Sequence, residues 1–395
     1  MKLDKFEYTY NEGLKNEWTI EDCQLSQINL IVGKNASGKS RIVRAIYILS
    51  ELLLRESVAH SLNDRKYKWN LYFNNDNPNK KTQYVLEIEN GLVVKEKLII
   101  NNENVLDRSQ SGEGTIKAEE LQTKMRFQSP QTELAVLKRR GDNIQHPFLE
   151  DIYQWAKSLR FYQFGTQLGQ NRVEPIPPTI DILKRKTDLK DDEYVISIFL
   201  LGKNEFQDNF SNKIIKDMGE IGYKISEVGT KIPSFFELGD ISPPDEYNSF
   251  PQFLYVQEDD LKAITEQSHM SQGMFRALSL FIQINYSLLA EKASCIIIDD
   301  IGEGLDYERA SAIIRLLIEK AETGLVQLIM TTNDQFIMNG VPLEYWSVIE
   351  RKSGSAKLHN ILNSKEKFEE FEFIGLNNFD FFTSEFALQE LGEDK

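Results

Sequence analysis

The sequence predicts an α/β fold in which helices flank a mixed or parallel sheet, with an antiparallel β subdomain and a largely helical insertion. Three features lead to this prediction. A glycine-rich segment joins an apolar run to an apolar helix, period-two alternation covers residues 71–100, and helical and apolar segments alternate after residue 250. The chain has 395 residues, 41% of them hydrophobic, which suffices for a substantial core.

The glycine-rich segment follows Ile28–Val32, a continuous apolar run typical of a buried central strand. It fits the pattern G-x-x-x-x-G-K-S/T without a mismatch, with the residues Gly33, Lys34, Asn35, Ala36, Ser37, Gly38, Lys39 and Ser40. The glycines let backbone N–H groups turn inward toward a phosphate, at the positive end of the following helix. We therefore expect Lys39 to reach the β- and γ-phosphates of a nucleotide and the Ser40 hydroxyl to bind Mg²⁺.

Period-two alternation dominates the segment after this helix, which we expect to end near Leu54. Residues 3–10 alternate loosely, as in an edge strand, and residues 71–100 take a period-two pattern, interrupted by 74–79 and by Asn90-Gly91. We expect an antiparallel sheet of hairpins here, which together with the glycine-rich segment makes a first lobe over residues 1–103.

The middle of the chain, residues 104–250, has a mixed polar and helical pattern that predicts an insertion. Turn clusters at 174–178 and 239–245 interrupt it. Its apolar spacing holds no heptad over three or four repeats, so we expect no long coiled-coil arm. Residues 251–395 then make a second lobe, starting with a short strand at Phe253–Val256.

A second group of polar residues stands at the end of the apolar run 293–298, where Asp299 and Asp300 follow. Parallel sheets bind ligands at the carboxyl ends of their strands, and a glycine-rich phosphate loop needs an acidic group to complete its metal site. One of these two acids can hold Mg²⁺ through water. The alternative interpretation is an ordinary buried strand that runs into a turn.

These residues resemble a family, the ABC-type ATPase heads, in particular the SMC-like and overcoming-lysogenization-defect (OLD) ATPases of the AAA superfamily. In that resemblance Asp299 is the Walker B aspartate and Asp300 takes the position of the catalytic glutamate. Ser271, Gln272 and Gly273 resemble the signature that contacts the γ-phosphate held by a second subunit, and Gly304-Leu305-Asp306 resembles the D-loop. A serine that caps a helix is the alternative interpretation of Ser271.

Two positions depart from the family pattern. Asp300 is shorter than the usual glutamate, so the resemblance implies slow hydrolysis or assistance from Glu303. Asn333 replaces the switch histidine after the strand 325–330, and an asparagine can hydrogen-bond a phosphate oxygen but cannot carry a proton as histidine can. The glutamine of the Q-loop has two candidates, Gln128 and Gln131, which are equally readable as surface residues.

Composition limits the partners. Lys and Arg total 46 against 61 Asp and Glu, a net charge of -15, so DNA contact is possible but not indicated, and it would need a local basic patch or a partner. Cys23 and Cys295 read as reduced thiols, and we find no leader peptide and no apolar run long enough for a membrane span. We expect a cytoplasmic protein without membrane contact.

The resemblance implies an ATPase that uses ATP and Mg²⁺, forms a homodimer or higher oligomer around them, and acts as a sensor or scaffold in anti-phage defence or DNA maintenance. Its effector, for which a nuclease is the candidate, would be separately encoded, because too few residues follow Asn333 for a Toprim nuclease domain. The alternative is a platform that ATP stabilises without hydrolysis. A GTPase is disfavoured because no Asn-Lys-x-Asp guanine motif occurs, and a small-molecule kinase is disfavoured because the paired signature and D-loop would have no role in it. The apolar C-terminal segment 371–382 reads as a core-docked tail or as a partner-binding face.

Overall fold

The computed structural model describes residues 1–55, 57, 62, 65–74, 80–166, 169–187, 194–235, 250–290, 294–374 and 377–384. The chain divides into two compact units. Unit 1 comprises Met1–Leu159 and Ile329–Lys395, and unit 2 comprises Arg160–Leu328. These two units are defined by spatial compactness. The predicted division into residues 1–103, 104–250 and 251–395 was based on sequence motifs and stays a prediction.

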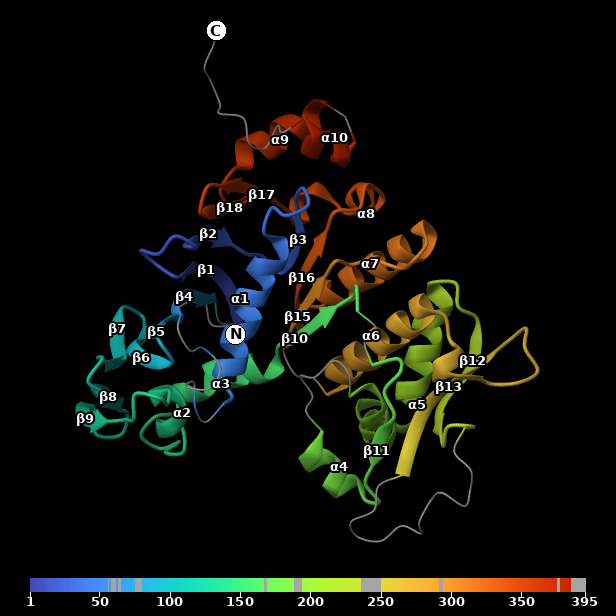
Figure 1. The fold of residues 1–395 in the computed structure, drawn as a ribbon, viewed down its shortest axis with the longest axis horizontal. Helices are drawn as coiled ribbons and strands as arrows, with labels where there is room; N and C mark the ends of the chain where they lie inside the picture. The colour runs from blue at the N-terminus through green and yellow to red at the C-terminus, as the bar shows by residue number, and fades with distance from the viewer. Residues whose placement is uncertain are drawn as a thin grey trace. The chain divides into compact units, whose positions relative to one another are not determined.

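Unit 1 is built on a mixed sheet that includes the blue and teal strands of Figure 1. Its strands in spatial order are β3 (Ile28–Val32), β17 (Trp346–Lys352), β18 (Ser355–Asn360), β2 (Trp18–Gln24), β1 (Lys2–Tyr10), β4 (Lys66–Asn74), β5 (Lys81–Glu89), β6 (Leu92–Ile100), β7 (Glu103–Arg108), β8 (Glu113–Ala118) and β9 (Thr123–Gln128). The unit 1 part of β16 (Val326–Thr332) lies on the other side of β3. All five residues of β3 are buried, as the continuous apolar run predicts.

The expected hairpins are confirmed, because β4, β5 and β6 pair in antiparallel register. Asn90 and Gly91 both have positive φ, as the two-residue turn between β5 and β6 requires. The interruption at 74–79 lies mostly outside the described residues, as does the turn cluster at 239–245. The prediction of an edge strand at residues 3–10 was wrong, since β1 pairs with both β2 and β4.

The start of the middle region is not helical. Residues 103–128 form the three short strands β7, β8 and β9, which extend the antiparallel sheet. Each strand has only six residues. Asn101 and Asn102 take positive φ in the turn between β6 and β7, and Gln122 does so in the turn between β8 and β9. Strands this short carry too few alternations to stand out from a polar, mixed pattern.

The helices of unit 1 are α1 (Lys39–Leu52), α2 (Ala135–Arg139), α3 (Leu149–Ser158), α8 (Gln335–Gly340), α9 (Lys365–Ile374) and α10 (Asn378–Thr383). Helix α1 packs on the sheet, and the indole Nε1 of Trp69 on β4 donates to the carbonyl of Ala45 at 3.0 Å. Phe371 and Phe381 of α9 and α10 are buried with ring centroids 4.7 Å apart. In its described part, the C-terminal segment is therefore docked on a core.

Unit 2 contains a parallel pair and a small antiparallel sheet. The pair is β10 (Arg160–Gln163) with β15 (Ser294–Asp299), and the small sheet has β13 (Phe250–Glu258) between β11 (Glu174–Ile176) and β12 (Ile225–Lys231), with β14 (Thr265–Glu266) on β13. Its helices are α4 (Ile180–Lys186), α5 (Val195–Glu220), α6 (Gln272–Leu289) and α7 (Tyr307–Glu322). Buried Asp217 ties three of them together, because its carboxylate accepts from Asn285 of α6 at 2.7 Å and pairs with Lys320 of α7 at 2.8 Å.

Helix α5 is not one continuous helix, because it consists of two helical segments that form a hairpin. Gln207 has φ 53° and ψ −135°, which no α-helix accommodates. A Cβ on Gly202 would lie 2.5 Å from the ring of Phe210, although eight residues of straight helix span about 12 Å. The two halves of α5 therefore fold back on each other, and the expectation that this region holds no long arm agrees with that geometry.

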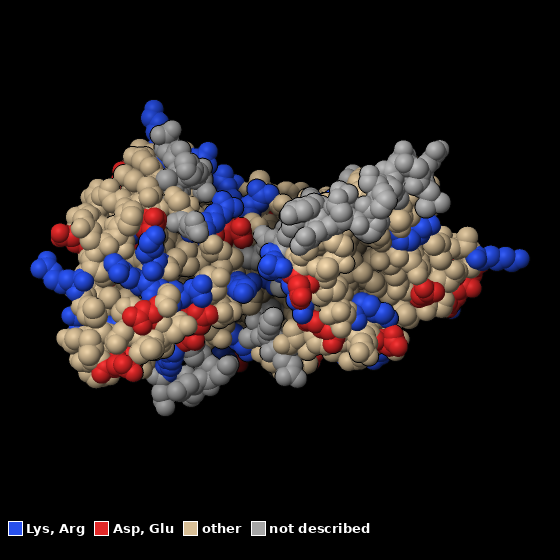
Figure 2. All heavy atoms as spheres, turned by 90° about the horizontal axis from the view of Figure 1, so that it is seen from below, with Lys and Arg blue, Asp and Glu red and all other residues tan. Residues whose placement is uncertain are grey.

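The charged side chains do not form a field of one sign on the face that Figure 2 shows, where Lys and Arg are interspersed with Asp and Glu. On the antiparallel sheet of unit 1, cross-strand pairs such as Lys66 with Glu89 and Lys97 with Asp107 neutralise each other. Among the helices in the described part of the chain, none has the length and apolar character needed to cross a membrane.

Candidate nucleotide-binding site

The glycine-rich loop of unit 1 runs from β3 into α1 and has the geometry of a phosphate cradle. Gly38 takes φ 113° and Ala36 φ 61°, so two residues in this short loop have left-handed backbone. Gly38 is the N-cap of α1, no side chain caps that helix end, and its first turn holds no acidic residue. Backbone N–H groups at such a helix end favour an anion.

The glycine-rich loop packs closely against β17. A Cβ on Gly33 would lie 2.1 Å from Cγ2 of Ile349 on β17 and 2.7 Å from the hydroxyl of Ser37. Only glycine fits at position 33 without displacing β17. The Ser37 hydroxyl is buried and has no hydrogen-bond partner within the described residues. A tight cradle lined by a buried hydroxyl fits an oxyanion such as a phosphate.

Two cations lie on this loop. The Lys39 ammonium is buried and donates to the carbonyls of Gly33 at 2.7 Å and Lys34 at 3.3 Å, so it lies across the concave side of the loop. Arg351, at the end of β17, donates to the carbonyl of Ala36. Sequence reasoning missed Arg351, because no local motif marks an arginine 315 residues away from its partner.

Asn333 lies next to the same loop. Its amide Nδ2 donates to Oδ1 of Asn35 at 2.8 Å, and Asp334 next to it caps α8. The position at the end of β16 was predicted from the motif order, and the structure places it in contact with the glycine-rich segment. The asparagine offers one further donor hydrogen and its carbonyl oxygen to a ligand there.

In unit 2 the two acidic residues stand at the carboxyl end of the β10–β15 pair. Asp299 is buried as the last residue of β15, and Asp300 follows with φ 56°. Left-handed backbone at a non-glycine residue turns the chain sharply, so the two consecutive carboxylates do not simply alternate as on a strand. Gln163, the last residue of β10, lies directly opposite Asp299 in the parallel register.

The residues predicted as candidates for the Q-loop glutamine were Gln128 and Gln131, and Gln163 was not among them. Gln128 ends β9 and its carbonyl accepts from Arg139, while the Gln131 amide donates to the carbonyl of Gln110, so both have structural contacts in unit 1. The signal at Gln163 was a short apolar run ending in a polar residue, and β10 has only four residues. Only strand pairing brings it beside Asp299.

Buried Arg276 of α6 holds the two loops at this strand edge together. Its Nε donates to the carbonyl of Thr166 after β10 at 3.0 Å, and its Nη1 donates to the carbonyl of Glu303 after β15 at 2.6 Å. Burial lowers the pKa of this guanidinium, and nearby Glu303 opposes that effect. A Cβ on Gly165 would lie 2.8 Å from the Glu303 carboxylate, so the carboxylate rests directly over that glycine.

The predicted signature and D-loop contact each other within unit 2. Ser271 caps α6, and its hydroxyl accepts from the amide of Met274 at 3.2 Å. A Cβ on Gly273 would lie 3.0 Å from the carbonyl of Gly304 and 2.8 Å from Leu305. Gln272 is exposed as the first residue of α6. Helix capping by Ser271 is therefore real, and it places the serine beside the loop that contains Asp306.

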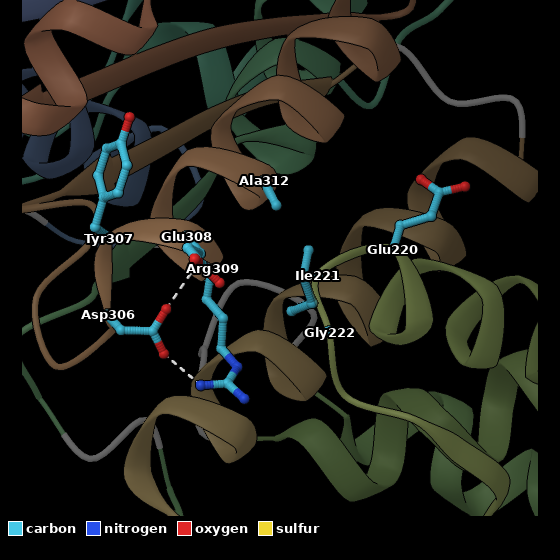
Figure 3. A pocket seen from close by; sticks show the side chains of 8 residues that line it. All are labelled: Glu220, Ile221, Gly222, Asp306, Tyr307, Glu308, Arg309 and Ala312. Carbon is cyan, nitrogen blue, oxygen red and sulfur yellow. Dashed lines mark hydrogen bonds and ion pairs between the residues drawn. The ribbon is translucent and has the colours of Figure 1, made fainter.

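Asp306 begins α7. Its carboxylate accepts from the amide of Arg309 at 3.0 Å and forms an ion pair with the Arg309 side chain, which lowers the pKa of the Asp306 carboxyl, with the backbone hydrogen bond the largest cause. Figure 3 shows this carboxylate turned toward Arg309, while the side chain of Tyr307 points away. Sequence reasoning assigned Asp306 but missed Arg309 as its partner.

The sequence matches the family described as "AAA domain, putative AbiEii toxin, Type IV TA system" over residues 28–339. The chain belongs to this AAA-domain family. Membership in this family indicates a P-loop domain of the AAA class and suggests ATP binding and hydrolysis. The matched range contains the glycine-rich loop, the predicted signature, the acidic pair and Asn333.

Solved structures show the same fold. The chain resembles an Smc head bound to the C-winged helix domain of ScpA, with 12% identity and a TM-score of 0.52, covering 91% of this chain and 97% of that one. It also resembles the Smc head domain with an extended coiled coil bound to the C-terminal domain of ScpA from Pyrococcus furiosus, with 13% identity, a TM-score of 0.51, and coverage of 95% and 99%. No curated relative matches the sequence.

Proposed function

We propose that this protein of the AAA-domain family binds ATP with Mg²⁺, hydrolyses it, and pairs with a second copy of itself around the nucleotide. The observation that carries the proposal is the glycine-rich loop, whose left-handed residues, uncapped helix end and overlying Lys39 ammonium suit a polyphosphate. Family membership and the SMC-head fold support the same activity.

Each residue then has a role that its chemistry allows. Ser40 and Asp299 would hold Mg²⁺, which supplies positive charge at the phosphates, and Gln163 beside Asp299 is a further candidate for an oxygen contact to the metal or its water. Asp300, with help from Glu303, would orient and deprotonate the attacking water. Asn333 would hydrogen-bond the γ-phosphate side of the nucleotide.

The other face of the nucleotide would belong to the second copy. Ser271, Gln272 and Gly273 stand at the N-terminus of the 18-residue helix α6, whose amide groups and dipole favour a phosphate oxygen. Asp306 would meet the neighbouring subunit beside them. Self-association that depends on ATP follows from this arrangement, because neither copy alone surrounds the γ-phosphate.

The cellular role we infer is that of a sensor or scaffold in anti-phage defence or DNA maintenance, in the manner of the OLD-type ATPases. The effector we propose is a separately encoded nuclease. The family description names a type IV toxin–antitoxin system, and the similar Smc heads are bound to a partner protein, which support partner binding. The net charge of -15 gives no support to broad DNA binding.

A second candidate is a platform that binds ATP without hydrolysing it. Asn333 favours it, because the asparagine contacts Asn35 of the loop yet cannot transfer a proton. The short side chain of Asp300 favours it as well. Steady-state phosphate release decides between the two candidates, since the platform releases none above background with or without DNA and a partner.

The experiment compares Lys39→Ala and Asp300→Ala with the parent. Lys39→Ala should abolish ATP binding by equilibrium titration, because it removes the ammonium at the phosphates, whereas Lys15→Ala at an exposed loop should bind ATP like the parent. Asp300→Ala should bind ATP and accumulate as a dimer in sedimentation velocity. Unchanged ATP affinity in Lys39→Ala would refute the assignment of the loop.

A further inference from the structure

Tyr223 stands where unit 2 brings the signature and the D-loop together. It lies on the connection between α5 and β12, where Gly222 takes φ 86° and the Tyr223 amide donates to the carbonyl of Met218 at 2.9 Å. This pattern is a glycine-terminated helix end, which fixes the residue that follows it. The position of Tyr223 is therefore set by the C-terminus of α5.

The Tyr223 hydroxyl touches the signature. It lies beside the Ser271 side chain, and a Cβ on Gly273 would lie 3.1 Å from it. Ser271 meanwhile accepts from the amide of Met274, so the hydroxyls of Tyr223 and Ser271 and the first turn of α6 form one connected group. Loss of the tyrosine hydroxyl removes one fixed contact of Ser271 and leaves its helix cap intact.

The Tyr223 ring contacts Arg309, the partner of Asp306 in the predicted D-loop. The Arg309 guanidinium carbon lies 4.4 Å from the ring centroid, a cation–π arrangement. The same guanidinium pairs with Asp306, as the dashed line in Figure 3 marks. Tyr223, Ser271 and Arg309 also line one hollow of about 670 Å³ at the start of α6.

We propose that Tyr223 and Arg309 form a relay that positions the signature serine relative to Asp306. The relay runs from Ser271 through the tyrosine hydroxyl and ring to the guanidinium and then to Asp306, in parallel with the direct contact between Gly273 and Gly304. Both residues are positioning residues. Because Tyr223 is attached to the end of α5, movement of that helical hairpin changes both elements together.

The contacts of the relay exist within one subunit, whereas its role in ATP-dependent dimerisation rests on the proposed function. Two measurements test the contacts and the role separately. The first is hydrogen exchange in the protein without nucleotide. Tyr223→Phe, which keeps the ring and loses the hydroxyl, should speed exchange of the amides at 271–275 and 304–310 by about fivefold, the scale of one lost polar contact. Tyr255→Phe is the matched control, because its hydroxyl bonds Glu227 on the antiparallel sheet.

The second measurement is the dimer dissociation constant with ATP in the Asp300→Ala background. Tyr223→Phe and Asp306→Asn should each raise it about fivefold, and the double variant should raise it no further, because both cut one relay. Arg309→Lys keeps the charge but loses the flat stacking group, so it should behave like Tyr223→Phe.

The outcomes are distinguishable. Unchanged exchange at 304–310 in Tyr223→Phe, or effects of Tyr223→Phe and Asp306→Asn that multiply independently, would overturn the relay. A parent that shows no ATP-dependent association while the exchange effect is present would overturn the proposed function and leave the relay standing as a link within the subunit.

Discussion

Arg276→Met is the substitution that most directly tests how the acidic loop is held. Arg276 is only 4% exposed, and it donates one hydrogen bond to each of the two loops at the carboxyl ends of β10 and β15. Methionine retains an unbranched apolar stem of similar length, so the core around the stem stays filled. What is lost is the bridge between Thr166 and Glu303.

The magnitude follows from those two bonds. Hydrogen bonds to a charged group contribute about 1.5–3 kcal/mol each, and at the lower end the pair contributes about 3 kcal/mol. That corresponds to a change of roughly 100-fold in the balance between the ordered and the displaced loop. Asp300 and Glu303 belong to that loop, so kcat should fall at least about tenfold. ATP affinity should be preserved, because the glycine-rich loop lies in unit 1.

The assay is steady-state phosphate release together with ATP titration and urea denaturation. Arg315→Met, at an exposed position of α7, is the control and should match the parent in all three. Arg276→Lys restores one donor and the charge and should be intermediate. A kcat within threefold of the parent, with normal ATP affinity and stability, would show that Arg276 does not order the loop.

Two further predictions concern unit 2. Buried Glu174 accepts hydrogen bonds from the amides of Ile196 and Ser197 at 2.9 and 3.0 Å, at the start of α5. Glu174→Ala should therefore lower the free energy of unfolding, measured by urea denaturation, by about 3 kcal/mol. A loss no greater than that of the exposed control Glu319→Ala would contradict this. Burial raises the pKa of Glu266, but its bonds with Lys231 and Ser234 outweigh that and hold the pKa at about 2, against an ordinary 4.5. A carboxyl whose pKa is lower in the folded state stabilises the protein fully above pH 4.5, and this stabilisation is lost as the pH falls through about 2. The difference in unfolding free energy between the parent and Glu266→Gln should therefore shrink between these pH values. A difference that stays constant would be inconsistent with the ion pair.

The relation between prediction and structure depends on how local each feature is. Gly33–Ser40 form one turn whose conformation is dictated by neighbouring residues, so the motif predicted the cradle and the helix that follows it. The β4–β6 hairpins were predictable for the same reason, since a two-residue turn at Asn90-Gly91 sets their register. By contrast, β7–β9 were missed because six-residue strands carry little periodicity.

By itself the sequence determined that the chain has a phosphate loop, an acidic strand end and a helix-opening serine, because each is a short contiguous pattern with its own backbone requirement. Only the tertiary structure decided which residues join them. Gln163 reaches Asp299 through strand pairing, Arg351 reaches Ala36 across 315 residues, and Tyr223 reaches Ser271 from the end of α5. Such contacts depend on how separate elements pack, and no spacing along the chain records that packing.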